Sequence, residues 1–241
     1  MSNQNQNRPQ PIGNAFGKYA EFDGKQTKLE IKLHEPDQGP NGLRFRTSVK
    51  QQFDDGTEKV TWGSAFSNVI GQNKDRVVFN VTTVARHPGP RTDEQGNFLD
   101  ANGSIVQSEQ EAQTVMKPMI NPKTNRPVYI PLAKIFTADF SKNNKPYPQT
   151  MFTGKVYTQE EGLNIARQDV GAASARGNGN TEKADAHARE SDRLQKETGS
   201  YFSIFPDANM LNQLSSLFNI QVNMPKPKVQ NNQGAPVPSG P

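Results

Sequence analysis

The chain has 241 residues, a hydrophobic fraction of only 32%, a net charge of +4 and no cysteine. This composition supplies a core for only part of the length, and it excludes disulfides, thiolate nucleophiles and cysteine-bound zinc. The start, MSNQNQNRPQPIG, lacks the apolar run of a secretion signal, and no window approaches 18 apolar residues, so we expect a soluble cytoplasmic protein with no membrane partner (in the host cell cytoplasm, if it is viral).

Residues 1–13 are rich in Asn, Gln and Pro and are predicted to form a disordered arm, followed by a β-rich domain over 14–170. Strands are predicted at 14–22 and 28–33. In the next strand, 43–50, one face is apolar and the other is cationic, because Leu43, Phe45, Thr47 and Val49 alternate with Arg44, Arg46, Ser48 and Lys50. The turn at 53–57 predicts a hairpin to a second strand at 59–62.

The rest of the domain is predicted to hold a short helical turn at 66–72 and a strongly β-prone run at 76–86. A long polar loop over 87–125 follows, and strands resume at 128–132, 134–140 and 150–157. Thr158 and Glu161 fit a capping box that opens a helix ending near Gly171.

The C-terminal part divides into three segments. Residues 171–199 are predicted to be a flexible joint, 171–181, and a polar helix, 181–198. Residues 200–222 are predicted to form a strand and an amphipathic helix that docks on the sheet core or on a partner chain; its stripe is Met210, Leu211, Leu214, Leu217 and Phe218. Residues 223–241 are predicted to be a disordered tail.

The sequence provides little support for catalysis. The three histidines, at 34, 87 and 187, lack the spacing of a metal pair, and no nucleophile elbow, kinase signature, phosphate loop or paired carboxylates occur. We therefore expect no enzyme, no cofactor and no metal. An enzyme whose site is assembled only by the fold, with acids from the 87–125 loop, is the alternative.

Cations and aromatic residues are interleaved in the strand-rich parts. Phosphates need cations and unstacked bases need flat apolar faces, so this mixture is typical of proteins that bind single-stranded nucleic acid. Arg44, Arg46 and Lys50 are predicted to neutralise phosphates, and Trp62, Tyr129 and Tyr147 to stack on bases. The full set of candidate residues is Arg44, Arg46, Lys50, Lys59, Trp62, Arg126, Tyr129, Lys134, Lys142, Lys145, Tyr147 and Lys155.

Two plainer interpretations compete with this one. The aromatic residues between 126 and 157 are also suited to a core, with the lysines forming an ordinary solvated face. Arg44 and Arg46 could instead form cross-strand ion pairs with Glu30 or Glu58.

The order of elements adds a resemblance. Antiparallel strands, a strand-to-helix step in TWGSAFSNVIG, more strands and a second step in MFTGKVYTQEEGLNIAR resemble the plan of whirly-type single-strand-binding proteins, and after them phage OB-fold single-strand-binding proteins. The resemblance covers at most residues 14–165 and implies a curved sheet whose exposed face holds single-stranded DNA or RNA. The tail, ending APVPSGP, lacks the acidic, aromatic tip of bacterial single-strand-binding proteins.

The sequence thus predicts an α+β, β-rich fold with a curved antiparallel sheet of whirly-like or OB-like type, two or three helices and disordered termini. The expected function is sequence-tolerant binding of single-stranded DNA or RNA by a homo-oligomer from a phage or mobile element. The alternative is a structural virion or scaffold component that self-assembles through flexible arms and the C-terminal helix.

Overall fold

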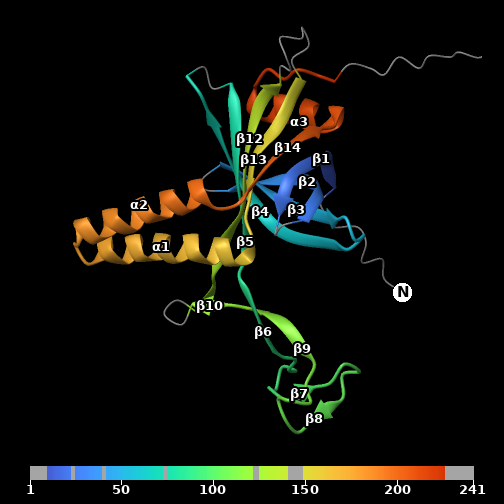
Figure 1. Ribbon diagram of the computed structural model, residues 1–241, viewed down its shortest axis with the longest axis vertical. Coiled ribbons are helices and arrows are strands. Elements are labelled where there is room, and N and C mark those ends of the chain that lie inside the picture. Colours follow the sequence, from blue (N-terminus) through green and yellow to red (C-terminus); the bar gives the residue numbers. More distant parts are fainter. Residues whose placement is uncertain are drawn as a thin grey trace, which may run out of the picture.

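Eight antiparallel strands of the computed structural model close into a barrel (Figure 1). The structure describes residues 10–22, 25–39, 42–72, 75–121, 125–140 and 149–225. Each barrel strand pairs with the next one along the chain, and the last closes on the first. The strands are β1 (Pro11–Phe22), β2 (Lys25–Gly39), β3 (Gly42–Phe53), β4 (Glu58–Ile70), β5 (Arg76–Val84), β12 (Tyr129–Phe140), β13 (Gln149–Val156) and β14 (Ser200–Pro206). The β-rich, antiparallel α+β prediction is confirmed.

Aromatic side chains fill the barrel, as the period-two alternation requires. The ring of Phe79 lies with its centroid 5.7 Å from that of Phe45 and 5.9 Å from that of Phe152. The helix α3 (Ala208–Phe218) contributes Phe218, whose centroid lies 6.1 Å from those of Phe45 and Phe79. The amphipathic C-terminal helix therefore docks on the core, which was one of its two predicted positions.

Both ends of the domain are tied to α3 and the barrel. Asp207 is the N-cap of α3, and its carboxylate accepts hydrogen bonds from the backbone N–H groups of Met210 and Asn14. The boundary of the predicted disordered arm is thus wrong, because β1 begins at Pro11 and residues 11–13 belong to it. At the other end, the backbone of Asn223 is hydrogen-bonded to Thr150 of β13, while residues 226–241 of the predicted tail lie outside the described part.

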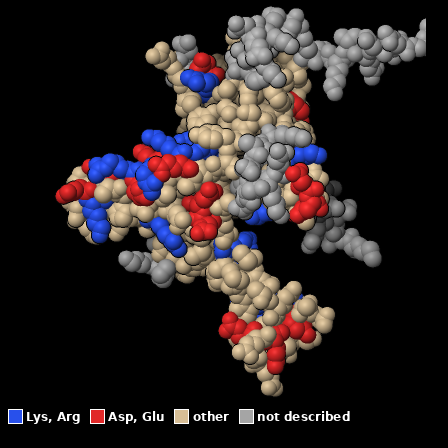
Figure 2. All heavy atoms as spheres, viewed as in Figure 1, with Lys and Arg blue, Asp and Glu red and all other residues tan. Residues whose placement is uncertain are grey.

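The predicted polar loop at 87–125 is largely structured. Between β5 and β12 the chain leaves the barrel as a ribbon of β6 (Arg86–Pro90) and β9 (Thr114–Pro118), which we call the arm. It carries β7 (Phe98–Leu99) and β8 (Ile105–Val106), and a second short ladder joins β10 (Ile120–Asn121) to β11 (Arg126–Pro127). The carboxylates of Asp93 and Asp100 accept hydrogen bonds from the backbone N–H groups two and four residues later, and these bonds close the turns in DEQGN and DANGS. Figure 2 shows acidic side chains gathered on the arm.

Two antiparallel helices, α1 (Gln159–Gly177) and α2 (Thr181–Glu197), form a hairpin that projects from the barrel between β13 and β14. The predicted capping box of Thr158 and Glu161 is confirmed. The predicted flexible joint at 171–181 is wrong, because α1 continues to Gly177. The helix packs closely against α2 there: a Cβ on Gly171 would approach the His187 ring to 2.9 Å, so a larger residue would have to displace that ring.

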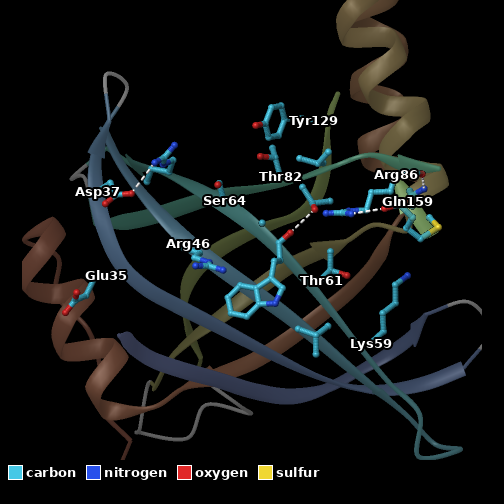
Figure 3. A pocket seen from close by; sticks show the side chains of 17 residues that line it. Glu35, Asp37, Arg46, Lys59, Thr61, Ser64, Thr82, Arg86, Tyr129 and Gln159 are labelled. Atoms are coloured by element: carbon cyan, nitrogen blue, oxygen red, sulfur yellow. Dashed lines mark hydrogen bonds and ion pairs between the residues drawn. The ribbon is translucent and has the colours of Figure 1, made fainter. Parts of the chain in front are cut away.

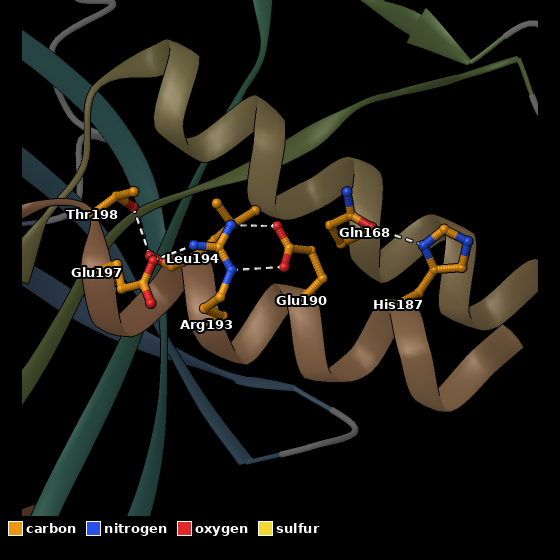
Figure 4. A network of polar contacts seen from close by, with 7 residues as sticks. All are labelled: Gln168, His187, Glu190, Arg193, Leu194, Glu197 and Thr198. Atoms are coloured by element: carbon orange, nitrogen blue, oxygen red, sulfur yellow. Dashed lines mark hydrogen bonds and ion pairs between the residues drawn. The ribbon is translucent and has the colours of Figure 1, made fainter. Parts of the chain in front are cut away.

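Polar contacts join α2 to α1, which explains how a helix with so few apolar residues packs against its neighbour (Figure 4). His187 is hydrogen-bonded to Gln168 at 2.7 Å, and buried Ser191 donates to Asp169 of α1 at 2.7 Å. Along α2, Arg193 is ion-paired with Glu190 at 2.7 Å and also with Glu197.

The predicted helical turn at 66–72 is also wrong. β4 runs on to Ile70 and pairs with β5 from Ser64 opposite Thr82 to Ile70 opposite Arg76. Ala65 and Ser67 are buried on the inner side of this strand, so the period-two alternation simply continues. The first strand-to-helix step of the whirly-type plan is therefore absent.

Candidate nucleic-acid interface

A groove opens on the outer surface where β4 and β5 part. These strands are paired only from Ser64 and Thr82 onward, whereas the first half of β4 is paired with β3 alone. Gly63 stands at the fork, where a Cβ would come within 2.4 Å of the Thr82 carbonyl oxygen, so a larger residue would force the strands apart. Beside it, the Thr83 hydroxyl donates to the Trp62 carbonyl at 2.8 Å and holds the two branches together.

The groove has a volume of about 920 Å³ and is open to solvent (Figure 3). One side is the β2–β3–β4 part of the barrel. The other side is formed by β5, β12, the base of the arm and the first residue of α1. Its lining residues are Glu35, Asp37, Arg44, Arg46, Lys59, Val60, Thr61, Trp62, Gly63, Ser64, Thr82, Thr83, Val84, Arg86, Met116, Tyr129 and Gln159.

Trp62 lies in the middle of the groove with 48% of its surface exposed. The guanidinium carbon of Arg46 is 4.7 Å from the indole centroid, a cation–π distance, and the His34 ring centroid is 5.5 Å away. These contacts orient the indole before any ligand arrives, which lowers the entropy cost of stacking on it. Phe66, 41% exposed, lies farther along β4, directly opposite Arg44 on β3.

Four cations line the groove and differ in how strongly they are held. The Arg44 guanidinium forms a 3.1 Å ion pair with Asp37, but both side chains are exposed, so the pair is weak and open to competition from a phosphate. Arg86 donates to the Met116 carbonyl at 2.9 Å, which keeps its remaining guanidinium donors at the base of the arm. Arg46 and Lys59 are exposed, and no ion pair holds either of them within the described residues.

Five of the predicted binding residues therefore come together in this groove. They are Arg44, Arg46, Lys59, Trp62 and Tyr129, the last of which is 59% exposed on β12. Arg126 is exposed on β11 but does not line the groove. Lys142, Lys145 and Tyr147 lie outside the described residues.

Lys50 does not join this set, although it lies on the same strand as Arg44 and Arg46. Its ammonium is ion-paired with Glu58 at 2.8 Å, and this hydrogen bond raises the pKa of Lys50 above its ordinary value. It borders a separate depression with Phe16 and Glu30 instead. Cross-strand ion pairing of the kind considered for the arginines thus occurs at Lys50, and also at Arg44, whose partner Asp37 lies directly opposite on β2. Lys50 differs from Arg44 and Arg46 in that it does not line the groove.

Two other predicted residues, Lys134 and Lys155, lie in a separate depression with residues from the end of α2. We call this surface the β12–β14 patch; its residues are Lys134, Phe136, Lys155, Tyr157, Lys196 and Tyr201. Lys155 is only 8% exposed, and its ammonium donates to the carbonyls of Gln195, Lys196 and Thr198 at the end of α2. It satisfies the last carbonyls of that helix, so it is engaged in structure and cannot also meet a phosphate.

Several residues in the groove or near it were not predicted from the sequence. Phe66, which lies farther along β4 and does not line the groove, was assigned to a helical turn, although the alternation from Trp62 through Ser64 was the signal that the strand continues. Arg86 and Met116 come from the base of the arm, and Gln159, which donates to the Arg86 carbonyl at 2.6 Å, comes from α1. No local pattern shows that these three segments meet.

Within the described residues, no group of three or more His, Asp or Glu side chains is placed to hold a metal ion. None of the helices in this part of the chain has the length and apolarity needed to cross a membrane. No family model matches the chain, and comparisons with curated proteins and with solved structures give no match either.

Proposed function

We propose that this protein binds single-stranded nucleic acid, DNA or RNA, with little sequence preference, in the groove at the β4–β5 fork. The proposal is carried by the position of Trp62, an oriented and half-exposed indole that contacts Arg46 in a groove lined by four cations. An indole stacks on any base, and cations contact any phosphate, so neither contact depends on sequence.

The groove also lacks the features of a site for a small apolar ligand. Such sites are enclosed and mostly apolar, with few polar groups. This groove is open, and charged or hydroxyl side chains from several strands line it. An open cationic channel suits a polymer that enters and leaves along its length.

The architecture supports the OB-like half of the expected resemblance more than the whirly-like half. A closed antiparallel barrel with a binding surface on its outer strands is compatible with an OB-like protein. The present barrel has eight strands in simple up-and-down order, whereas an OB fold has five in Greek-key order. The likeness to OB-fold proteins that we propose therefore concerns the closed barrel and its cationic face, and not the order of the strands.

The test is fluorescence anisotropy of a labelled 30-mer, as single-stranded DNA and as single-stranded RNA, at two salt concentrations. Wild-type protein is compared with Arg44→Ala/Arg46→Ala and with Arg167→Ala/Arg189→Ala, a control that removes the same charge from exposed positions on the helical hairpin. We expect the groove variant to bind about tenfold or more weakly. Its salt dependence should also be smaller, by about 0.7 in slope for each phosphate that is no longer neutralised.

The control variant should bind like wild type. If both double variants weaken binding equally, the cations act only through net charge, and the groove is not the site. If the folded wild-type protein does not bind at low salt, the proposed function is wrong.

A second candidate is a structural component of a virion or scaffold, which the arm favours. The arm leaves the barrel as a separate ribbon and exposes Ile105 at 68% and Met116 at 49%; Ile120, just beyond it, is 45% exposed. Light scattering over a range of salt tests this candidate. Assembly through apolar contacts persists or strengthens as salt rises, whereas nucleic-acid binding weakens.

A further inference from the structure

Charge is distributed unevenly across the groove, and the asymmetry follows the strand order. Both acids that line it, Glu35 and Asp37, lie on β2 at one rim. In Figure 3 they lie on one side of Trp62, and Lys59 and Arg86 lie on the other. The two acids offset Arg44 and Arg46 of the neighbouring strand, so the part of the groove on the β2 side of Trp62 has no net charge. The part on the other side of Trp62 has two cations, Lys59 of β4 and Arg86.

This asymmetry fixes how a single strand lies in the groove. Its one phosphate backbone is attracted most strongly where Lys59 and Arg86 provide uncompensated charge, and less strongly by Arg44 and Arg46, because the two acids offset them. Its bases then extend over Trp62, and their edges point toward the carboxylates of β2. Carboxylates accept hydrogen bonds from exocyclic amino groups of bases such as cytosine, so this rim suits base edges. Glu35, which has no ion pair within the described residues, also repels a phosphate, whereas Arg44 offsets the charge of Asp37.

A duplex cannot satisfy the same arrangement. Its two backbones flank each groove at a separation of about 6 to 12 Å, so with one backbone on the cationic side the other falls toward the opposite rim. There it would meet the carboxylates of Glu35 and Asp37. Placing like charges together across an interface costs several-fold to many-fold in affinity and is a common means of rejecting the wrong partner.

We infer that Glu35 and Asp37 form an acidic rim that makes the groove selective for single-stranded over double-stranded nucleic acid. This inference rests on the proposed function and adds the reason for its substrate class. A substitution of Glu35 alone is the more informative variant. Asp37 is also the ion-pair partner of Arg44 at 3.1 Å, so a substitution there changes two charges of the groove at once.

The experiment compares anisotropy of a labelled single-stranded 30-mer and of the duplex of the same sequence. The proteins are wild type, Glu35→Gln, Glu35→Gln/Asp37→Asn and the control Glu182→Gln/Asp185→Asn. The control makes the same charge change on exposed residues at the start of α2, the end of the helical hairpin away from the barrel. All changed positions are exposed, and circular dichroism verifies that each variant is folded.

We expect Glu35→Gln to tighten duplex binding several-fold while single-strand binding changes by less than about twofold. The rim double variant should narrow the ratio of single-strand to duplex affinity by about tenfold, because it removes the repulsion by Glu35 and also frees Arg44 from Asp37 to attract the second backbone. The control should leave that ratio unchanged.

Three results would overturn the inference, each in a different way. If the rim variants tighten single-strand and duplex binding by the same factor, the carboxylates act only through net charge. If duplex binding does not change, some other feature sets the selectivity. If wild-type protein binds no single strand, the proposed function fails first, and this inference falls with it.

Discussion

Two surfaces of the barrel carry the same residue types but differ in how their cations are engaged. The groove and the β12–β14 patch each combine lysine or arginine with exposed aromatic rings, Trp62 in one and Tyr201 in the other. In the patch, the best-placed cation, Lys155, is buried under Tyr201 and donates to three helix carbonyls. In the groove, Arg46 lies at the surface beside the indole. The difference shows that the same cation–aromatic composition can serve structure at one surface and leave a cation exposed at another.

The largest expected effect on binding comes from removing the Trp62 ring, and removal of the Tyr201 ring from the patch is the matched control. Trp62→Ala should lower single-strand affinity by about 1–3 kcal/mol, or about 5- to 150-fold, because a stacked base loses its platform. Tyr201→Ala, which removes the 67% exposed ring of the patch, should change affinity by less than about twofold. Anisotropy titration of both variants measures this, and equal losses would mean that the patch also binds the strand.

The next effect is on stability and belongs to the patch. Lys155→Met should cost about 2 kcal/mol, because three carbonyls at the end of α2 lose a charged donor within a partly buried site. Thermal unfolding should show a decrease in Tm of about 4–8 °C, with single-strand affinity unchanged. Lys134→Met is the matched control, since the Lys134 ammonium lies 5.7 Å from the Phe136 ring and has no helix end to satisfy. A stable Lys155 variant that binds weakly would reverse our assignment of this residue.

The smallest expected effect separates two lysines of the β3–β4 hairpin. Lys59→Gln should make the negative slope of log affinity against log salt shallower by about 0.7, because one phosphate is no longer neutralised. Lys50→Gln should leave the slope unchanged, because Lys50 is paired with Glu58 outside the groove. A salt series of anisotropy titrations gives both slopes. A lower slope for Lys50→Gln would place the strand farther along β3 than we propose.

Local patterns predicted much of the barrel. The alternation from Leu43 to Lys50 correctly predicted an inner face, buried at Phe45, and an outer face carrying Arg44 and Arg46. The capping box at Thr158 and the apolar stripe of α3 were likewise sufficient, since each is contained within a few residues. These features arise from forces that act along one strand or one helix turn.

The site itself depends on contacts that no local pattern contains. The groove exists because the pairing between β4 and β5 ends at Ser64 and Thr82. Where the pairing of two strands ends depends on their register, and the residue pattern of neither strand contains that information. Lys155 looked like a surface cation because its partners, the carbonyls at 195–198, lie about forty residues farther along the chain. For the same reason the approach of Arg86 and Gln159 to the groove could not be predicted.

The most direct test of the central claim uses the intrinsic fluorescence of Trp62. It is the only tryptophan of the chain, so its emission reports on the groove alone. We predict that titration with an unlabelled single-stranded 30-mer quenches this emission with the same midpoint as the anisotropy change of a labelled strand, and that added salt reverses both. Binding seen by anisotropy with unchanged tryptophan emission would contradict the account, because the strand would then lie elsewhere on the protein.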